Sequence, residues 1–374
     1  GAAAKPEFAA RLFEDGERYS LGRVELEMRL TPGHTPESMS IVVWEHPDDQ
    51  APYSVLTGDT LFIGDVGRPD LLVSVGKSSE ELGSMLFRSL HDKLLTLPDS
   101  TRVLPAHGAG SACGKNLSTE TMSTIGDQRR DNYALQIRDA QKFVEIVTEG
   151  QPPAPGYFIF DAKLNAQNRG VLDEHTPPKR LTIGEAVWRQ RYGARIIDTR
   201  DPQYFALGHL RGSVNVGLQG RYAEYAGAVI NPDEEIVVVT EAGTELEAKV
   251  RLARIGYAKL TGWVSVDDLA SDFDHVVQAS RLTRAQFAVR RHKVDNVQVV
   301  DVRNEGEAAD GAIDGAVNIP VAQLRARMSE LDPSKPTVVY CAGGYRSSIA
   351  ASLLREAGFT DVSDVLGGYA AIAA

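Results

Sequence analysis

The sequence predicts an α/β protein whose C-terminal part contains two tandem copies of one domain built around a parallel sheet. From about residue 180 onward, short β-branched runs alternate with helical segments, which is typical of strands that form a parallel sheet covered by helices. The same succession of motifs also occurs twice, at an offset that stays between 101 and 103 residues.

The first third of the chain is predicted to be mixed α and β. Four short strands are expected, at Val24–Leu30, Ser40–Trp44, Tyr53–Thr57 and Thr101–Pro105. Leucines at helical spacing predict a helix over Ser79–Leu97. Residues 119–149 are predicted to form one long helical segment that ends at Gly150.

A segment rich in proline, glycine and asparagine follows, at residues 151–179, and is predicted to be a linker that lies along a domain surface. We therefore expect a first domain over residues 1–150, this linker, and the two repeated domains over 180–275 and 280–374.

Five pairs of motifs carry the repeat. They are residues 180–182 and 281–283, 196–200 and 299–303, 212–216 and 315–319, 236–239 and 337–340, and 255–257 and 357–359. In the first pair, Thr182 and Thr283 each stand three residues before Glu185 or Gln286, a capping-box pattern that begins a helix.

The second repeat carries a cysteine between a predicted strand and a predicted helix. The loop Cys341-Ala342-Gly343-Gly344-Tyr345-Arg346 follows the strand, and such a loop directs backbone N–H groups toward one point at the positive end of the helix. These dipoles and Arg346 would favour a thiolate at Cys341, and the loop would hold a persulfide or an oxyanion. The alternative is a buried cysteine that only packs.

The motifs Asp301-x-Arg303, Gly315-Ala-Val-Asn-Ile319 and Cys341-x-x-Gly-x-Arg346-Ser resemble the rhodanese family, and the six-residue loop resembles its sulfur-transferring branch. The resemblance implies that Cys341 and Arg346 are catalytic and that Ala342, Gly343, Gly344 and Tyr345 bind the transferred group. The loop of the first repeat, residues 240–245, has neither cysteine nor arginine and carries two glutamates. We expect this repeat to be inactive and structural.

Three motifs in the first third each place one potential metal ligand after a strand. They are Thr31-Pro-Gly-His34-Thr, Thr57-Gly-Asp59 and Leu104-Pro-Ala-His107-Gly. A single histidine or aspartate beside glycine is more often part of a turn. In this order, however, the three resemble the metallo-β-lactamase superfamily. Residues 64–70 and 108–115 resemble, more narrowly, the persulfide dioxygenases that are fused to rhodanese domains.

This resemblance implies part of an αββα metallo-β-lactamase-type domain and a mononuclear Fe(II) held by two histidines and one carboxylate. His34 and Asp59 match two of the ligands, and His107 matches a ligand of a second metal in hydrolase relatives. Arg68 is a candidate for holding a carboxylate of a glutathione-like thiol. The pattern leaves open whether Cys113 contacts substrate or only packs.

The superfamily's His-x-His-x-Asp-His motif is absent from the place where it is expected, because residues 1–33 contain no histidine. We therefore expect that the N-terminal part of the first domain is missing. This chain should then bind iron weakly and lack dioxygenase activity.

Charge and cysteine content restrict the function further. The formal net charge of the 374 residues is −11, which argues against non-specific binding to nucleic acid or to an anionic membrane. No apolar run approaches the roughly 18–20 residues that span a bilayer, and the opening residues lack the layout of a secretory signal. The two cysteines form no disulfide framework, and we expect a reducing compartment such as the cytoplasm.

The leading hypothesis is a sulfide-detoxifying enzyme. A persulfide such as glutathione persulfide would be oxidised to sulfite at the iron site, and Cys341 would transfer sulfur as a persulfide, with thiosulfate or sulfite as partners. The alternatives are a thioester hydrolase of the glyoxalase II kind and a non-catalytic rhodanese scaffold. The sequence leaves open the physiological thiol, the direction of transfer and whether the chain forms a homo-oligomer.

Overall fold

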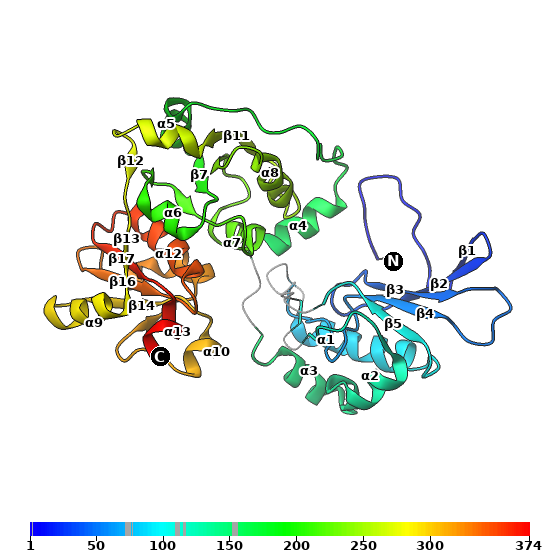
Figure 1. Ribbon diagram of the computed structural model, residues 1–374. Coiled ribbons are helices and arrows are strands. Elements are labelled where there is room, and N and C mark those ends of the chain that lie inside the picture. The colour runs from blue at the N-terminus through cyan, green and yellow to red at the C-terminus, as the bar shows by residue number, and fades with distance from the viewer. Residues whose placement is uncertain (2, 72–75, 77, 109–112, 115–116, 152–155) are drawn as a thin grey trace. The chain divides into compact units, whose positions relative to one another are not determined.

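The protein is described here from a computed structural model, which covers residues 1, 3–71, 76, 78–108, 113–114, 117–151 and 156–374 (Figure 1). The chain divides into two compact units. Unit 1 comprises Gly1–Ala154 and Ala162–Arg169, and unit 2 comprises Pro155–Asp161 and Gly170–Ala374. Most of the 108–115 motif and residues 152–155 of the predicted linker lie outside the described residues. Among the helices that are described, none is both long and apolar enough to cross a membrane.

Unit 1 contains a six-stranded sheet in the order β1-β2-β3-β4-β5-β6. The strands are β1 (Arg18–Leu21), β2 (Val24–Leu30), β3 (Met39–Trp44), β4 (Ser54–Gly58), β5 (Arg102–Pro105) and β6 (Ser123–Thr124). Neighbours are antiparallel except β4 and β5, so β2, β4 and β5 all run in one direction. Their carboxyl ends therefore lie at the same edge of the sheet.

The helices of unit 1 gather on one face of this sheet (Figure 1). They are α1 (Ser79–Arg88), the π-helical turn η2 (Ser89–Leu94), α2 (Ile125–Asp131), the 3-10 turn η3 (Ala134–Gln136) and α3 (Ala140–Thr148). Ser78 and Asp139 cap α1 and α3 by accepting backbone N–H groups. Apolar residues of α1, η2 and α3 pack with the sheet in one buried cluster.

The prediction of a single helix over residues 119–149 was wrong. Strand β6 precedes α2, and Asn132 ends α2 because its side-chain amide donates to the Asp65 carbonyl at 3.0 Å while its Oδ1 accepts from the N–H of Ala134 at 3.1 Å. Such side-chain to backbone bonds compete with helix continuation. The predicted helix over Ser79–Leu97 is present as α1 followed by η2.

The predicted linker contains a helix, α4 (Tyr157–Ala166). Tyr157 is buried in the apolar core of unit 2, where its ring lies over Gly227; a Cβ at Gly227 would be 2.3 Å from the Tyr157 ring. The segment was predicted to be a linker because of its proline and glycine content. Its aromatic residues at 157, 158 and 160 instead lie in this core or pack against it.

The first repeat in unit 2 has a parallel sheet in the order β11-β10-β7-β9. Its strands are β7 (Arg195–Asp198), β9 (Val214–Asn215), β10 (Ile236–Thr240) and β11 (Leu260–Ser265), with a small antiparallel pair of β8 (His209–Leu210) and β12 (Val276–Val277). Its helices are α5 (Ile183–Arg191), α6 (Pro202–Leu207), α7 (Tyr222–Val229), α8 (Glu245–Ala253) and the 3-10 helix η4 (Val266–Ser271).

The second repeat has a parallel sheet in the order β13-β17-β16-β14-β15. The strands are β13 (Ser280–Leu282), β14 (Gln298–Asp301), β15 (Val317–Asn318), β16 (Thr337–Tyr340) and β17 (Val362–Val365). The helical elements are α9 (Arg284–Lys293), α10 (Glu305–Ala309), η5 (Val321–Gln323), α11 (Leu324–Arg327), η6 (Met328–Glu330), α12 (Tyr345–Glu356) and α13 (Gly368–Ala373). Both predicted capping boxes are present, at Thr182 and Thr283. The predicted parallel-sheet fold is confirmed in both repeats.

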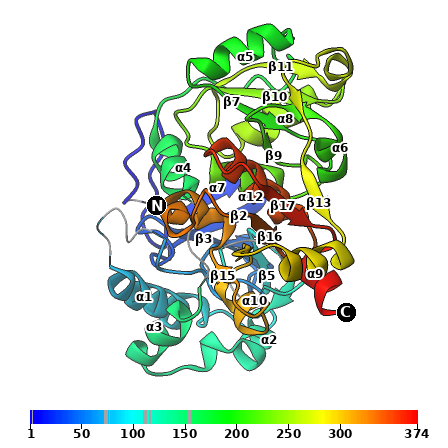
Figure 2. The same ribbon diagram turned by 90° about the vertical axis from the view of Figure 1, so that its left-hand side faces the viewer.

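The two repeats share one apolar core, and α12 lies beside α7 within it (Figure 2). Polar contacts add to this packing. Asn215 of the first repeat donates its backbone N–H to Ser352 at 3.1 Å and accepts from Ser348 at 2.6 Å, and Arg195 forms an ion pair with Glu356. The active loop predicted for the second repeat therefore begins a helix that is packed against the first repeat.

Candidate functional sites

Cys341 directly follows β16 and lies below the N-terminus of α12. Its side chain is buried, and the Gly344 N–H donates to Cys341 Sγ at 3.1 Å, while the thiol is 3.6 Å from Ser347 Oγ. Gly344 caps the helix with φ at +105°, a conformation that favours glycine. The loop therefore directs the amide dipole of Gly344 toward the sulfur atom, as the sequence predicted.

The C-terminal helix α13 fixes the base of this loop. The N–H groups of Tyr369 and Ala370 donate to the carbonyls of Cys341 at 2.6 Å and Ala342 at 3.2 Å. Gly368 allows this approach, because a Cβ at that position would lie 2.2 Å from the Cys341 carbonyl oxygen. This support was not predicted from the sequence, although the pair Gly367-Gly368 is the signal that indicates it.

Arg346 is held by a partner that the sequence analysis missed. Its two terminal nitrogens donate to the carboxylate of Glu307 on α10 at 2.6 and 2.7 Å. This two-point contact raises the pKa of Arg346 and lowers the pKa of Glu307. The guanidinium is thus held by Glu307, and an anion bound by Arg346 would share it with this carboxylate.

The loop of the first repeat has the same frame with different chemistry. Thr240 stands in the place of Cys341, and its hydroxyl contacts the hydroxyls of Thr199 and Thr244, each at 2.6 Å. A pocket of about 180 Å³ lies beside it, lined in part by Glu241 and Arg200. Because Thr240 has no thiol, this pocket contains no nucleophile for sulfur transfer, and the expectation of an inactive repeat stays a prediction.

Tyr345 joins the two repeats at the predicted active loop. Its hydroxyl donates to the carbonyl of Gly217 in the first repeat at 2.6 Å, and its ring lies 5.5 Å from the ring of Tyr225 between centroids. A Cβ at Gly220 would meet the ring of Tyr345 at 2.5 Å, so the glycine leaves room for this side chain. The first repeat therefore contacts the loop that carries Cys341.

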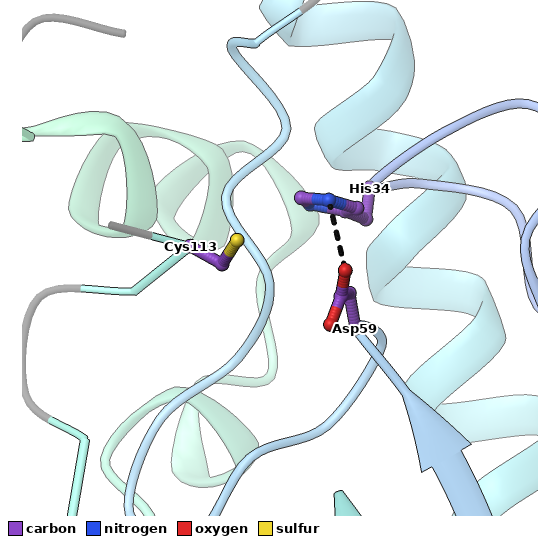
Figure 3. A group of neighbouring side chains, drawn as sticks. All are labelled: His34, Asp59 and Cys113. Atoms are coloured by element: carbon purple, nitrogen blue, oxygen red, sulfur yellow. Dashed lines mark ion pairs between the residues drawn. The ribbon is translucent and has the colours of Figure 1, made fainter. Parts of the chain in front are cut away.

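In unit 1, the residues that follow β2, β4 and β5 converge at one sheet edge. His34 Nε2 lies 3.4 Å from Asp59 Oδ2, and His107 Nε2 lies 3.2 Å from Asp59 Oδ1 (Figure 3 shows His34 and Asp59). The three predicted metal ligands are thus brought together, as parallel directions of their strands require.

The ionisation of these groups follows from their burial and contacts. Burial lowers the pKa of His34, which favours its neutral form. Burial alone would raise the pKa of Asp59, but contact with His107 and the charges of both histidines outweigh it and lower the pKa. Polar contact with Asp59, and then with Cys113, raises the pKa of His107 to about 10.

The loop at residues 64–70 supports this cluster from one side. The Arg68 carbonyl accepts from His34 Nδ1 at 3.0 Å. Arg68 is 1% exposed, and its guanidinium donates to Asp70 at 2.8 and 2.6 Å. In this conformation the guanidinium is paired with Asp70 of its own loop, and the predicted contact with a substrate carboxylate stays a prediction.

The donor set fits a divalent metal ion. Two imidazoles face the two oxygens of one carboxylate, which is the ligand chemistry of mononuclear non-haem iron. Asp59 Oδ1 is buried and accepts no aligned hydrogen bond from the residues that the structure describes. His34, Asp59 and His107 would hold the ion, and Cys113 Sγ lies in a group with His34 and Asp59 whose ligand atoms are all within 4.8 Å of one another (Figure 3).

Comparisons with known proteins agree with this division of the chain. The family described as rhodanese-like domain matches residues 185–265 and 284–374. The chain is 39% identical to the uncharacterized protein YqhL of Bacillus subtilis over 88 residues, which is 24% of this chain and 68% of that protein. The metallo-beta-lactamase of Staphylococcus aureus subsp. aureus COL superposes with a TM-score of 0.61 at 28% identity and covers 68% of this chain and 71% of that chain.

The chain is a fusion of a metallo-β-lactamase-type unit with two rhodanese-like domains. This confirms the predicted family and fold class. The persulfide dioxygenase ETHE1, mitochondrial, of Homo sapiens is 31% identical over 152 residues, which is 41% of this fusion chain and 51% of that protein. The chain thus spans about half the length of the curated relatives that it matches first.

Proposed function

We propose that this fusion protein is a sulfurtransferase that carries sulfane sulfur on Cys341. The observation that supports this proposal most directly is the position of Cys341 Sγ at the N-terminus of α12, where the Gly344 N–H donates to it at 3.1 Å. An amide in this position stabilises negative charge on sulfur without needing to reorganise. The matching rhodanese-like family at residues 284–374 supports the same assignment.

The transfer takes place in two displacements. The Cys341 thiolate attacks the outer sulfur of a persulfide or of thiosulfate, a sulfur–sulfur bond forms, and the original sulfur–sulfur bond breaks to release a thiolate or sulfite. The Cys341 persulfide then gives its outer sulfur to a second thiolate or to sulfite. Gly344 would stabilise charge on the sulfur. Arg346, kept in place by Glu307, would lie close to the anionic leaving group.

Mass spectrometry of the intact chain tests this directly. Thiosulfate or glutathione persulfide should add the mass of one sulfur atom to the chain, and Cys341→Ser should not take up sulfur while Cys113→Ser should. If Cys341→Ser is loaded as well as the parent, the assignment is wrong. If neither donor loads the parent protein, the rhodanese part is a scaffold.

We further propose that unit 1 belongs to a persulfide-oxidising site, because His34, Asp59 and His107 converge there. A ferrous ion would supply activation of dioxygen when bound. His34 and Asp59 would hold it, the contact of His34 Nδ1 with the Arg68 carbonyl would orient the imidazole, and sulfite formed from a persulfide would be a substrate for Cys341.

Metal content distinguishes this site from that of a thioester hydrolase, which needs two zinc ions. One Fe(II) per chain with oxygen uptake on glutathione persulfide would support the proposed persulfide oxidation. Two zinc ions with thioester hydrolysis would overturn it.

A further inference from the structure

Cys113 is the one cysteine that the proposed sulfur transfer does not use. Its side chain is buried, and its sulfur belongs to the group formed with His34 and Asp59. In Figure 3 the thiol points toward the side chains of His34 and Asp59. A cysteine in this position has a second chemistry available besides packing, because thiolate, imidazole and carboxylate are all ligands of zinc and cobalt.

The loop that contains Gly67 and Arg68 contacts all three of the residues His34, Asp59 and Cys113. The backbone of Arg68 accepts from His34 Nδ1 at 3.0 Å through its carbonyl and donates through its N–H to the Cys113 carbonyl at 3.2 Å. The preceding residue, Gly67, passes so close to Asp59 that a Cβ would lie 1.8 Å from the Asp59 carbonyl oxygen. The ligand-bearing segments are thus tied to each other through backbone atoms, which are stiffer than surface side chains.

These contacts determine which nitrogen of His34 can bind a metal ion. A carbonyl can only accept, so His34 Nδ1 carries the hydrogen, and the lone pair of His34 is on Nε2, 3.4 Å from Asp59 Oδ2. Such a contact on the far nitrogen is how proteins orient metal-binding histidines. Asp59 Oδ1 is buried and is approached by His107 Nε2 at 3.2 Å, so both oxygens of this carboxylate face an imidazole nitrogen.

We propose that Cys113 is a thiolate ligand, with His34 and Asp59, of a divalent metal site in unit 1. The three ligand atoms lie within 4.8 Å of one another, so they would need to close by about an ångström to bind one ion at the usual 2.0–2.3 Å. His107 stands on the other oxygen of Asp59, at 3.2 Å, and is the nearest additional nitrogen. The site shares His34 and Asp59 with the proposed iron site, but its test requires neither sulfur transfer at Cys341 nor persulfide oxidation.

In the competing account Cys113 is not a ligand. Its thiol then only contacts His107, and a metal ion would be held by His34, His107 and Asp59. Cobalt distinguishes the two accounts, because a thiolate bound to Co²⁺ absorbs in the near ultraviolet and nitrogen or oxygen ligands do not. The chain has two cysteines, so Cys341→Ser leaves Cys113 as the single thiol.

The experiment titrates Co²⁺ into the full chain carrying Cys341→Ser, without oxygen. A near-ultraviolet charge-transfer band should appear at one Co²⁺ per chain. It should vanish on adding Cys113→Ser, and His34→Ala should weaken cobalt binding by at least about tenfold, the lower limit for disturbing a metal's surroundings. His46→Ala, at an exposed histidine of the same unit, should leave band and affinity unchanged.

A second measurement needs no change in unit 1. Zn²⁺ should slow the alkylation of Cys113 by iodoacetamide in the Cys341→Ser chain at least tenfold, followed by intact mass, and a chelator should restore the original rate. The proposal fails if cobalt binds without the charge-transfer band, if the band survives Cys113→Ser, or if zinc leaves alkylation unchanged. None of these outcomes bears on sulfur loading of Cys341, which is measured separately by the intact mass of the parent protein.

Discussion

Replacing Tyr345 by phenylalanine removes one atom at the contact between the predicted active loop and the first repeat. The lost hydroxyl donates to the Gly217 carbonyl at 2.6 Å, and Gly217 is buried. Removing the donor leaves this carbonyl without that partner, which costs about 1–3 kcal/mol when the acceptor cannot reach water. At roughly 2–4 °C per kcal/mol for a unit of this size, the unfolding midpoint should fall by about 2–12 °C.

The same change should lower the rate of sulfur loading, because Tyr345 lies in the loop that begins at Cys341. Two assays on the full chain measure this: thermal unfolding, and the rate at which thiosulfate adds sulfur to the intact mass. Tyr192→Phe is the matched control, since Tyr192 is 76% exposed in the first repeat and should affect neither quantity.

The contact can also be disturbed from the opposite side. Gly220→Ala would place a Cβ 2.5 Å from the ring of Tyr345, so the ring or the loop must move. This cost should disappear when Tyr345 is already alanine, giving a coupling energy of about 1–3 kcal/mol in a double-mutant cycle. If Tyr345→Phe loads and unfolds like the parent protein, and the cycle shows no coupling, the first repeat does not position the loop.

Three further predictions concern unit 2. Gly368→Ala, which would place a Cβ 2.2 Å from the Cys341 carbonyl oxygen at a φ of +56°, should destabilise the unit by about 2 kcal/mol or more and slow sulfur loading; unchanged denaturant midpoints would contradict this. Glu307→Gln should cost about 1–3 kcal/mol and reduce loading, because Arg346 loses its charged partner, and loading at the parent rate would show that Arg346 needs no such support. Burial lowers the pKa of His209 to about 4 from an ordinary 6.5, so the unfolded chain protonates this histidine at a higher pH than the folded chain does. The stability that the neutral histidine contributes is complete above pH 6.5 and declines by about 3 kcal/mol as the pH falls toward 4. Urea unfolding at each pH should show a smaller decline in His209→Gln.

The repeated domains could be predicted from the sequence in some detail because their local signals and their tertiary contacts agree. Asn215 and Asn318 occupy the same place in the two copies, and each donates its side-chain amide to two carbonyls of the preceding strand and loop. The repeated Asp-x-Arg motif likewise forms an ion pair within each copy. Residues whose partners are a few positions away leave a pattern that can be recognised.

The parts that could not be predicted depend on partners distant in the sequence. Glu307 binds Arg346 across 39 positions, and Tyr345 reaches Gly217 across 128, and neither pairing has a spacing rule. Helix α4 was missed because its stability comes from burying Tyr157 in the core of unit 2, not from its own composition. The convergence of His34, Asp59 and His107 was predictable only through strand direction, and the position of Cys113 beside them was not.

The common core of the two repeats has a consequence for anyone who wishes to isolate the sulfur-transfer domain. The same buried cluster includes Val216 and Leu218 from one copy and Leu353 and Leu354 from the other, with Cys341 among its members. Cutting the chain between the two repeats, near residue 279, would expose the apolar residues of this cluster on both fragments. We therefore expect the second repeat to be less soluble when it is separated from the first, because the first repeat covers part of its apolar core.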